Sequence, residues 1–417
     1  MREQVLGEDS CFFKDVRTLV SDAGPVELYC AFHDRLCTPK ATEGLVAGVS
    51  CKDISKANAY KHLRKGSGVL QNESSKGGSA DTWHATLRIV VQHAPAWVIL
   101  ENSDELVNDE CVDWTRIVKA LRSYGYRCKT LSVDTAEFAL PQHRGRAYLV
   151  ATAVVHSSHS INEFDVFHQS FTDNVCRMRR IPPSVLDILL SHDDPKVQKA
   201  LDEWQSHEAS SLQASTADGH MSMVLNKRRS PLVMSYARLK CRDSTQASPW
   251  YRGMNMRARE VLAEAQEDTK HERSIMLHDV GQSMNRCPRS APLIGHPNVL
   301  IAPAILPGSN LWVTMPDPGA SESTQLHSRV PTERFLLPEE LLLIQGWPVH
   351  NSPVELHEHS NSVKASFAGN AFSSSVMMSV FCSLMAAIPW TELSTHDEGS
   401  ADAEAEAREA AELLKLM

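Results

Sequence analysis

The sequence predicts an α/β fold with a doubly wound sheet and a smaller, mostly irregular second domain. Three observations predict it. Short apolar runs typical of buried strands occur at 45–49, 97–100 and 147–154. Segments with helical periodicity lie between them, and strand, helix, strand in this order indicates a parallel or mixed sheet with helices on its faces. From 158 to 330 the pattern dissolves into polar turns, prolines and short helical pieces.

The first of these strands leads into Ser50 and Cys51. In an open α/β sheet the carboxyl ends of the strands are where chemistry is done, so Cys51 is a candidate nucleophile. The glycine-containing polar segment 66–78 is expected to form a loop that closes over whatever Cys51 attacks. The alternative is that Cys51 is one more small buried hydrophobic residue.

Helices are expected where apolar residues recur every three or four positions. One begins at Asp81, and another runs from Val112 to Tyr124 and ends at Gly125. The strand 97–100 between them runs into Glu101, and a glutamate directly after four apolar residues favours a cleft. A further strand is expected at Arg127–Val133.

Regular structure returns near the end of the sequence. Pro338 followed by two glutamates is typical of the first turn of a helix, which Gly346 ends. A last helix is expected at 373–387. Within the irregular region, only the short pieces 185–190, 194–204 and 258–267 are expected to be helical.

Composition bounds the class of protein. The chain has 417 residues, a net charge of −9 and a pI near 6.1, which excludes a uniformly basic nucleic-acid coat. An apolar run of about 18 residues is absent, so no contact with a membrane is expected. Ten cysteines without a C-x-x-C pair favour a reducing, intracellular compartment over disulfides or a zinc site. No metal is expected, and His350, His357 and His359 are interpreted as part of a solvated loop.

One local stretch is strongly basic. Residues 227–259 hold nine Lys or Arg against a single acid, Asp243, together with Tyr236, Trp250 and Tyr251. Phosphate contacts need positive charge and base stacking needs aromatic rings, so the combination favours nucleic-acid binding. An ordinary solvated basic face is the alternative.

Five sequence features, in this order, resemble the cytosine-5 methyltransferase family. They are Gly48-Val49-Ser50-Cys51, Glu101-Asn102-Ser103, Gln142-x-Arg144-x-Arg146, the block from Arg334 to Gln345-Gly346-Trp347-Pro348, and Gly369-Asn370. The resemblance spans about residues 43–385. It implies a catalytic domain at 1–157, a target-recognition region at 158–331, a return to the catalytic domain at 332–390 and an acidic tail at 391–417.

The resemblance implies transfer of a methyl group from S-adenosyl-L-methionine to C5 of a flipped cytosine in DNA. Cys51 would add to C6 of the base, because C5 is a poor nucleophile until a thiolate attacks C6. Glu101 would act as the acid at N3. Arg144 and Arg146 alternate, so in an extended backbone they would share one face and hold the cytosine O2 and the adjacent phosphate.

The remaining site residues follow from the same resemblance. Gln142, Asn102 and Ser50 are expected to bind the substrate, and Asn370 and Asp15 the cofactor. The block ending at Pro348 is interpreted as structural.

The sequence departs from the family in several places. Cys51 lies between Ser50 and Lys52 instead of proline and glutamine, and Ser103 replaces the usual valine. A Phe-x-Gly-x-Gly cofactor loop does not precede Cys51, so the catalytic domain is expected to be incomplete at its start. Two alternatives therefore remain open: cytosine-5 methylation of transfer RNA, and a catalytically inactive nucleic-acid-binding relative. A nuclear location is inferred from the DNA substrate, and protein partners remain unknown.

Overall fold

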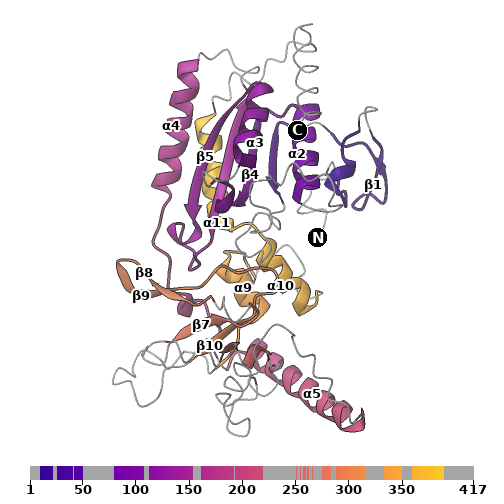
Figure 1. Ribbon diagram of the computed structural model, residues 1–417, viewed down its shortest axis with the longest axis vertical. Helices are drawn as coiled ribbons and strands as arrows, with labels where there is room; N and C mark the ends of the chain where they lie inside the picture. Colours follow the sequence, from indigo (N-terminus) through magenta and orange to yellow (C-terminus); the bar gives the residue numbers. More distant parts are fainter. Residues whose placement is uncertain are drawn as a thin grey trace. The chain divides into compact units, whose positions relative to one another are not determined.

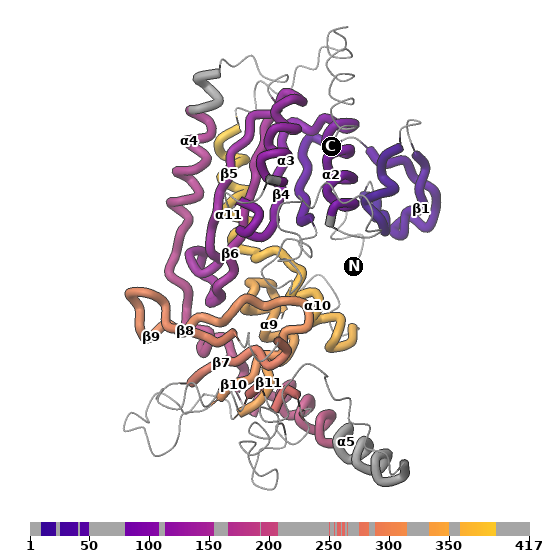
Figure 2. The backbone as a smooth tube through the Cα atoms, in the orientation of Figure 1, coloured from indigo at the N-terminus to yellow at the C-terminus, as the bar shows by residue number. Residues whose placement is uncertain are grey.

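A computed structural model describes the residues that are coloured in Figure 2. The described residues are 10–21, 26–40, 42–49, 79–107, 112–153, 161–191, 193–218, 250, 254, 257–259, 261–262, 265, 275–282, 288–314, 333–349 and 359–388. The chain divides into two compact units. The first comprises Met1–Asp134, Gly145–Arg179 and Met378–Met417, and the second Thr135–Arg144 and Arg180–Met377.

The first unit contains a four-stranded mixed sheet in the order β3, β4, β6, β5 (Figure 1). The strands are β3 (Gly44–Gly48), β4 (Trp97–Ser103), β5 (Tyr126–Asp134) and β6 (Gly145–Ala153). β3 and β4 are parallel, whereas β6 is antiparallel to both of its neighbours. The carboxyl ends of β3 and β4 therefore meet the start of β6 at one edge of the sheet.

Helices cover both faces of this sheet. α2 (Ser79–His93) and α3 (Val112–Ser123) share a buried cluster with Val98 and Leu100 of β4. The neighbouring Trp97 points to the opposite face, because successive side chains of a strand alternate. Its ring packs edge-on against Phe381 of α11 (Ser374–Ala387). The predicted α/β class is confirmed.

Most of the predicted elements are present, with shifted ends, but 185–190 forms only a 3-10 turn at 185–187 and 258–267 lies partly outside the described residues. β4 continues through Ser103, so Glu101 lies within the strand, and β6 begins at Gly145. Sequence periodicity missed α4 (Ile161–Arg177) and α10 (Asn361–Asn370), and α5 (Pro195–Asp218) is longer than expected. Asp81 lies in the first turn of α2, which starts at Ser79. The predicted loop at 66–78 lies outside the described residues.

Short elements connect and extend these units. The beginning of the described chain holds the 3-10 turn η1 (Val16–Thr18) and a hairpin of β1 (Leu28–Cys30) and β2 (Arg35–Cys37). Three further 3-10 turns are η4 (Asp104–Val107), η5 (Thr135–Glu137) and η6 (Val185–Asp187).

The second unit is more ordered than its sequence suggests. It holds a three-stranded antiparallel sheet in the order β11, β10, β7 and a separate β8–β9 hairpin. The strands are β7 (Met276–Asp279), β8 (Ala291–Leu293), β9 (His296–Ile301), β10 (Leu311–Thr314) and β11 (Arg334–Phe335). α9 (Pro338–Ile344) follows, as predicted, and Gly346, two residues after its end, has φ +82°. The functional domain boundaries stated above stay predictions.

The interpretation of Trp250 as a base-stacking residue is wrong. Its side chain is buried in a cluster with Trp312 and Leu337, and its ring lies 5.7 Å from that of Trp204. The residue therefore belongs to the core of the second unit. Tyr236, Tyr251 and most of the basic residues of 227–259 lie outside the described residues.

His278 of β7 makes stability depend on pH. The side chain is fully buried, and among the described residues neither ring nitrogen has a hydrogen-bond partner. Burial, and secondarily the charge of Arg289, lowers the pKa of His278 from 6.5 to about 4. Between these values the unfolded chain binds a proton that the folded chain does not, so stability falls as the pH drops from 6.5 towards 4.

We expect the titration of His278 to lower the free energy of unfolding by about 2 kcal/mol when the pH is lowered from 7.5 to 5. Chemical denaturation of the wild type and of His278→Gln at both pH values measures it. The wild type should lose more stability than the variant by that amount. Equal losses in the two proteins would show that His278 does not titrate in this way.

No single helix of the described chain is long and apolar enough to cross a membrane. α10 and α11 meet the length and composition criteria only as a pair, with a bend of 41° between them.

Candidate active site

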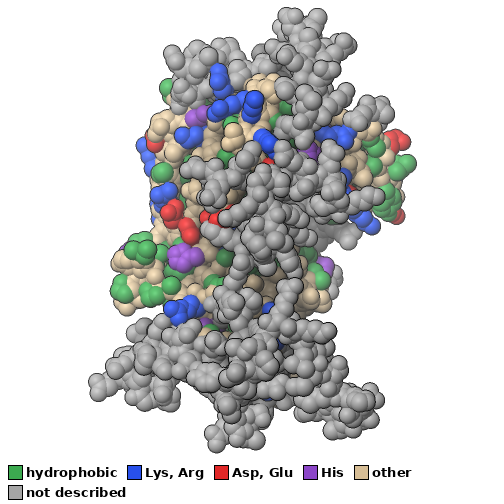
Figure 3. All heavy atoms as spheres, in the orientation of Figure 1, with side chains coloured by type: hydrophobic (Ala, Val, Ile, Leu, Met, Phe, Trp, Pro, Cys, Tyr) green, Lys and Arg blue, Asp and Glu red, His purple; other side chains and the backbone are tan. Residues whose placement is uncertain are grey.

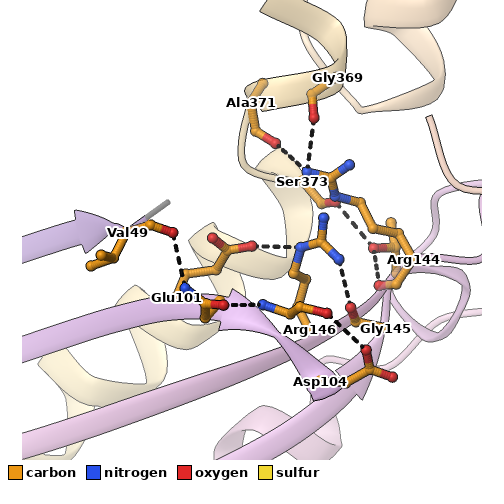
Figure 4. Close-up of polar contacts among 12 residues, drawn as sticks. Val49, Glu101, Asp104, Arg144, Gly145, Arg146, Gly369, Ala371 and Ser373 are labelled. Atoms are coloured by element: carbon orange, nitrogen blue, oxygen red, sulfur yellow. Dashed lines mark hydrogen bonds and ion pairs between the residues drawn. The ribbon is translucent and has the colours of Figure 1, made fainter. Parts of the chain in front are cut away.

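An ion pair at one edge of the sheet joins two of the predicted catalytic residues. Glu101 of β4 and Arg146 of β6 sit on adjacent antiparallel strands, and Nε of Arg146 lies 2.7 Å from Oε1 of Glu101 (Figure 4). Their side chains are 12% and 13% exposed, so the pair is largely but not fully desolvated. Among the described residues, Oε2 of Glu101 and Nη2 of Arg146 have no further partner. The pair therefore presents an acceptor and a donor side by side.

The strand that leads to the predicted nucleophile is tied to the same edge. Gly48 pairs with Glu101 in the parallel ladder, and the backbone N–H of Val49 donates to the carbonyl of Glu101 at 3.3 Å. The buried side chain of Asn102 donates to the carbonyl of Val49 at 2.9 Å. Asn102 thus joins the ends of β3 and β4, and its expected substrate contact stays a prediction. Ser50 and Cys51 lie outside the described residues.

Arg144 is placed differently from Arg146. It lies one residue before β6 and belongs to the second unit, and the expected strand face shared by the two arginines stays a prediction. Its side chain is buried, and its guanidinium donates to the carbonyl of Ile305 at 2.7 Å. It also donates to the carbonyls of Gly369 and Ala371, each at 3.2 Å (Figure 4). A planar guanidinium suits this fork of acceptors. Arg144 therefore holds the end of α10 to the loop after β9, and its expected contact with the base stays a prediction.

A buried chain of hydrogen bonds continues from Arg144. The hydroxyl of Thr135 donates to the Arg144 carbonyl at 3.0 Å and lies 3.1 Å from the hydroxyl of Ser373. Ser373 donates to Oε1 of Gln345, and Nε2 of Gln345 donates to the carbonyl of Ala368. Three of the family-like sequence features thus meet inside the second unit. Sequence reasoning missed Thr135 and Ser373, because neither residue carries a signal at the level of a motif.

Gly369 lies where no side chain fits. A Cβ atom there would lie 2.1 Å from the backbone nitrogen of Pro307 and 2.3 Å from the carbonyl carbon of Leu306. Both contacts are with backbone, so an added methyl group must displace one segment from the other. The glycine therefore lets α10 approach the loop whose Ile305 carbonyl binds Arg144.

Gly369→Ala is expected to destabilise the second unit by about 1–3 kcal/mol through overpacking. Helix propensity alone predicts the opposite sign, because alanine is favoured over glycine inside a helix by about 1 kcal/mol. Thermal unfolding distinguishes the two, with Ser362→Ala on the exposed face of the same helix as the control. A variant more stable than the wild type would contradict the close approach.

Gln142 is fully buried, and its backbone bridges to Ala302. Among the described residues, neither oxygen nor nitrogen of its side-chain amide has a hydrogen-bond partner. An unpaired buried amide costs about 1–3 kcal/mol, so this position is one where a ligand would find an available donor and acceptor. Its expected contact with the substrate stays a prediction.

The two residues expected to bind the cofactor use their side chains locally. The amide of Asn370, the exposed last residue of α10, donates to the carbonyl of Ser366 at 3.0 Å. The carboxylate of Asp15 caps η1 and pairs with Arg17, whose hydrogen bonds lower the pKa of Asp15 to about 2. The amide nitrogen of Asn370 and the carboxylate of Asp15 are thus engaged within their own segments. Their expected contacts with S-adenosyl-L-methionine stay predictions.

A family model described as C-5 cytosine-specific DNA methylase matches residues 33–386. The match covers most of the chain, so the chain belongs to this family, whose methyl donor is S-adenosyl-L-methionine. The predicted family and cofactor are confirmed.

Curated relatives match part of the chain. It is 30% identical over 191 residues to DNA (cytosine-5-)-methyltransferase DMT5 of Cryptococcus neoformans, covering 46% of this chain and 7% of that protein. It is 26% identical over 141 residues to Protein GAMETOPHYTE DEFECTIVE 1 of Arabidopsis thaliana, covering 34% and 22%. The chain thus spans less than a quarter of either relative.

Solved structures show weaker likeness. The Dnmt2 methyltransferase of S. pombe matches with a TM-score of 0.36 and 12% identity, and the Entamoeba histolytica methyltransferase EhMeth with 0.37 and 11%. Each comparison covers 82% of this chain and 77% of the other.

Proposed function

We propose that the chain transfers a methyl group to C5 of cytosine in DNA, with the base flipped out of the stack and Cys51 as the nucleophile. The observation that carries this proposal is the Glu101–Arg146 pair, held beside the end of the strand that leads to Cys51. Cys51 follows Val49 by two residues, and two residues extend a chain by about 7 Å at most.

The proposed chemistry begins with the thiolate of Cys51. It forms a bond to C6 of the cytosine, and the electron pair released from the C5–C6 double bond makes C5 nucleophilic. The cofactor, when bound, supplies the electrophilic methyl group. After C5 is methylated, a water molecule takes the C5 proton, the electron pair of that C–H bond re-forms the C5–C6 double bond, and the C6–S bond breaks to release the thiolate. Cys51 therefore returns unchanged at the end of each cycle.

Glu101 and Arg146 complement the polar edge of the base. Cytosine presents the acceptors O2 and N3 and the donor N4 on one edge. Arg146 has a donor for O2, and the neighbouring carboxyl of Glu101 reaches N3 and N4, where hydrogen bonding or protonation relieves the charge that attack at C6 creates. Because the two groups are already paired, little reorganisation is needed when the base arrives.

DNA is favoured over RNA by the name of one relative, a DNA (cytosine-5-)-methyltransferase that is 30% identical over the matched segment. The basic composition of 227–259 fits a polyanionic substrate of either kind. A DNA substrate leads us to propose a nuclear location.

The test is transfer of a labelled methyl group from S-adenosyl-L-methionine to duplex DNA or to transfer RNA, each offered alone and in competition. Nucleosides released by digestion are separated to identify the product. We expect 5-methyl-2′-deoxycytidine from DNA and no label in transfer RNA. If the label were found only in transfer RNA, the substrate would be RNA and the proposed DNA substrate would be wrong. Failure to bind S-adenosyl-L-methionine by calorimetry would favour the inactive nucleic-acid-binding alternative.

A further inference from the structure

Four metal-ligand side chains converge near the beginning of the described chain. Cys11, Cys30, His33 and Cys37 each offer one ligand atom, and all four atoms lie within 4.8 Å of one another. Cys30 ends β1, Cys37 ends β2, and His33 lies in the turn between these strands. Cys11 comes from the segment beside the hairpin, to which it is tied because Ala31 donates its N–H to the carbonyl of Phe12 at 2.8 Å.

The spacing of these atoms fits a tetrahedral metal ion. Nδ1 of His33 lies 3.6 Å from Sγ of Cys11 and 3.4 Å from Sγ of Cys37. A zinc ion bound at 2.3 Å to sulfur and 2.0–2.1 Å to nitrogen separates these atoms by about 3.6 Å at the tetrahedral angle. Simple thiol to imidazole hydrogen bonds explain two of the contacts but not why Cys30 joins the same group.

Backbone amides point at the sulfur of Cys30. The N–H of Phe12 donates to it at 3.2 Å, and the N–H groups of Phe32 and His33 also hydrogen bond to it. Several amide donors around one sulfur suit an anionic thiolate better than a neutral thiol, and such outer contacts orient metal ligands. Cys30 is also fully buried, whereas the other three ligands are partly exposed.

The hairpin buries little of its apolar side chains, so the hydrophobic effect does not explain its folding. Its strands have three residues each, and the large apolar side chains around them, Phe12, Tyr29 and Leu36, are 51–60% exposed. Exposed hydrophobic side chains are visible over the β1 region (Figure 3). A short two-stranded hairpin is at best marginally stable alone. A bound metal supplies the stability that burial does not.

We propose that Cys11, Cys30, His33 and Cys37 bind one structural zinc ion. Four protein ligands close the coordination sphere, so the metal orders the hairpin and leaves no open position for a substrate. Cys11 and Cys30 precede the region matched by the family model, so the site is a feature of this chain beyond that match. No C-x-x-C pair marks the site in the sequence, because the spacing here is Cys30-x-x-His33-x-x-x-Cys37.

The test is the metal content of the purified full chain, prepared under reducing conditions in the absence of chelators. Elemental analysis should find one equivalent of zinc per chain. Replacement by cobalt should give the intense visible absorption of a tetrahedral site with thiolate ligands. Cys30→Ser and Cys37→Ser should lose the metal, whereas Cys176→Ser, at an exposed cysteine outside the group, should keep it. His33→Cys should retain one equivalent, because Cys₄ is also a zinc site.

Three results would overturn the proposal. One is wild-type protein that contains no stoichiometric zinc and binds cobalt only with octahedral spectra. Another is a disulfide among Cys11, Cys30 and Cys37, found by mass spectrometry in protein purified under reducing conditions. The third is full zinc retention in both Cys30→Ser and Cys37→Ser. The wild-type measurements do not depend on whether any variant folds.

Discussion

Glu101→Gln is expected to lower the rate of methyl transfer by about 10²–10⁴-fold, the range typical of removing a general acid. Glutamine keeps the size of the side chain and a hydrogen bond to Arg146, but unlike a carboxylate it can neither take up a proton nor pass one to N3 of the base. The Arg146 contact at 2.7 Å becomes one between a charged and a neutral group. Binding of DNA, which depends mainly on phosphate contacts, should change little.

Single-turnover methyl transfer to duplex DNA measures the effect, with DNA binding and thermal unfolding recorded in parallel. Glu203→Gln, in an exposed pair with Lys199 on α5, is the matched control and should retain full activity. Unchanged turnover by Glu101→Gln would remove Glu101 from the catalytic machinery. Lost turnover with an equally large drop in the unfolding temperature would indicate a structural role instead.

Glu340→Gln is expected to cost about 3–5 kcal/mol of stability, because it leaves a buried cation without its counter-charge. Arg334 and Glu340 are both fully buried and make two parallel hydrogen bonds of 2.8 Å. The carboxylate also accepts the N–H groups of Leu190 and Leu337, and the guanidinium donates to the carbonyls of Leu190 and Phe335. The pair thus joins three segments of the second unit.

The neighbouring Glu339 provides the control. Its partner is Lys364 at 2.6 Å, and both side chains of that pair reach solvent. We expect Glu339→Gln to cost less than Glu340→Gln, about 1–3 kcal/mol, because these side chains are 17% and 10% exposed and water can partly hydrate the lysine that is left without its partner. Denaturant unfolding of the two variants measures the difference. Equal losses in the free energy of unfolding would show that burial does not determine how much the Arg334–Glu340 pair stabilises the fold.

Local patterns in the sequence predicted the sheet and its nearest helices well. The apolar runs at β3, β4 and β6 and the periodicity of α2 and α3 are properties of neighbouring residues, so they can be read without the fold. Glu101 was predicted on the same grounds, because it follows four apolar residues. Its pairing with Arg146 was not predicted, since that contact depends on how β4 and β6 are aligned.

Arg144 shows what local patterns cannot supply. Its carbonyl acceptors lie 161, 225 and 227 residues further along the chain, so no window of sequence around Arg144 reports its burial. Trp250 was misjudged for the same reason, because its basic neighbours suggested an exposed surface. The four residues of the proposed zinc site were missed because no C-x-x-C pair marks them and because Cys11 reaches the hairpin only through the fold.

The most direct test of the account is a covalent one. The chain is incubated with duplex DNA carrying 2-pyrimidinone in place of a target cytosine, a base whose C6 traps thiols, and the product is digested for mass spectrometry. An adduct is expected on Cys51, present in Cys176→Ala and absent in Cys51→Ala. An adduct on another cysteine, or methyl transfer by Cys51→Ala at the wild-type rate, would contradict it.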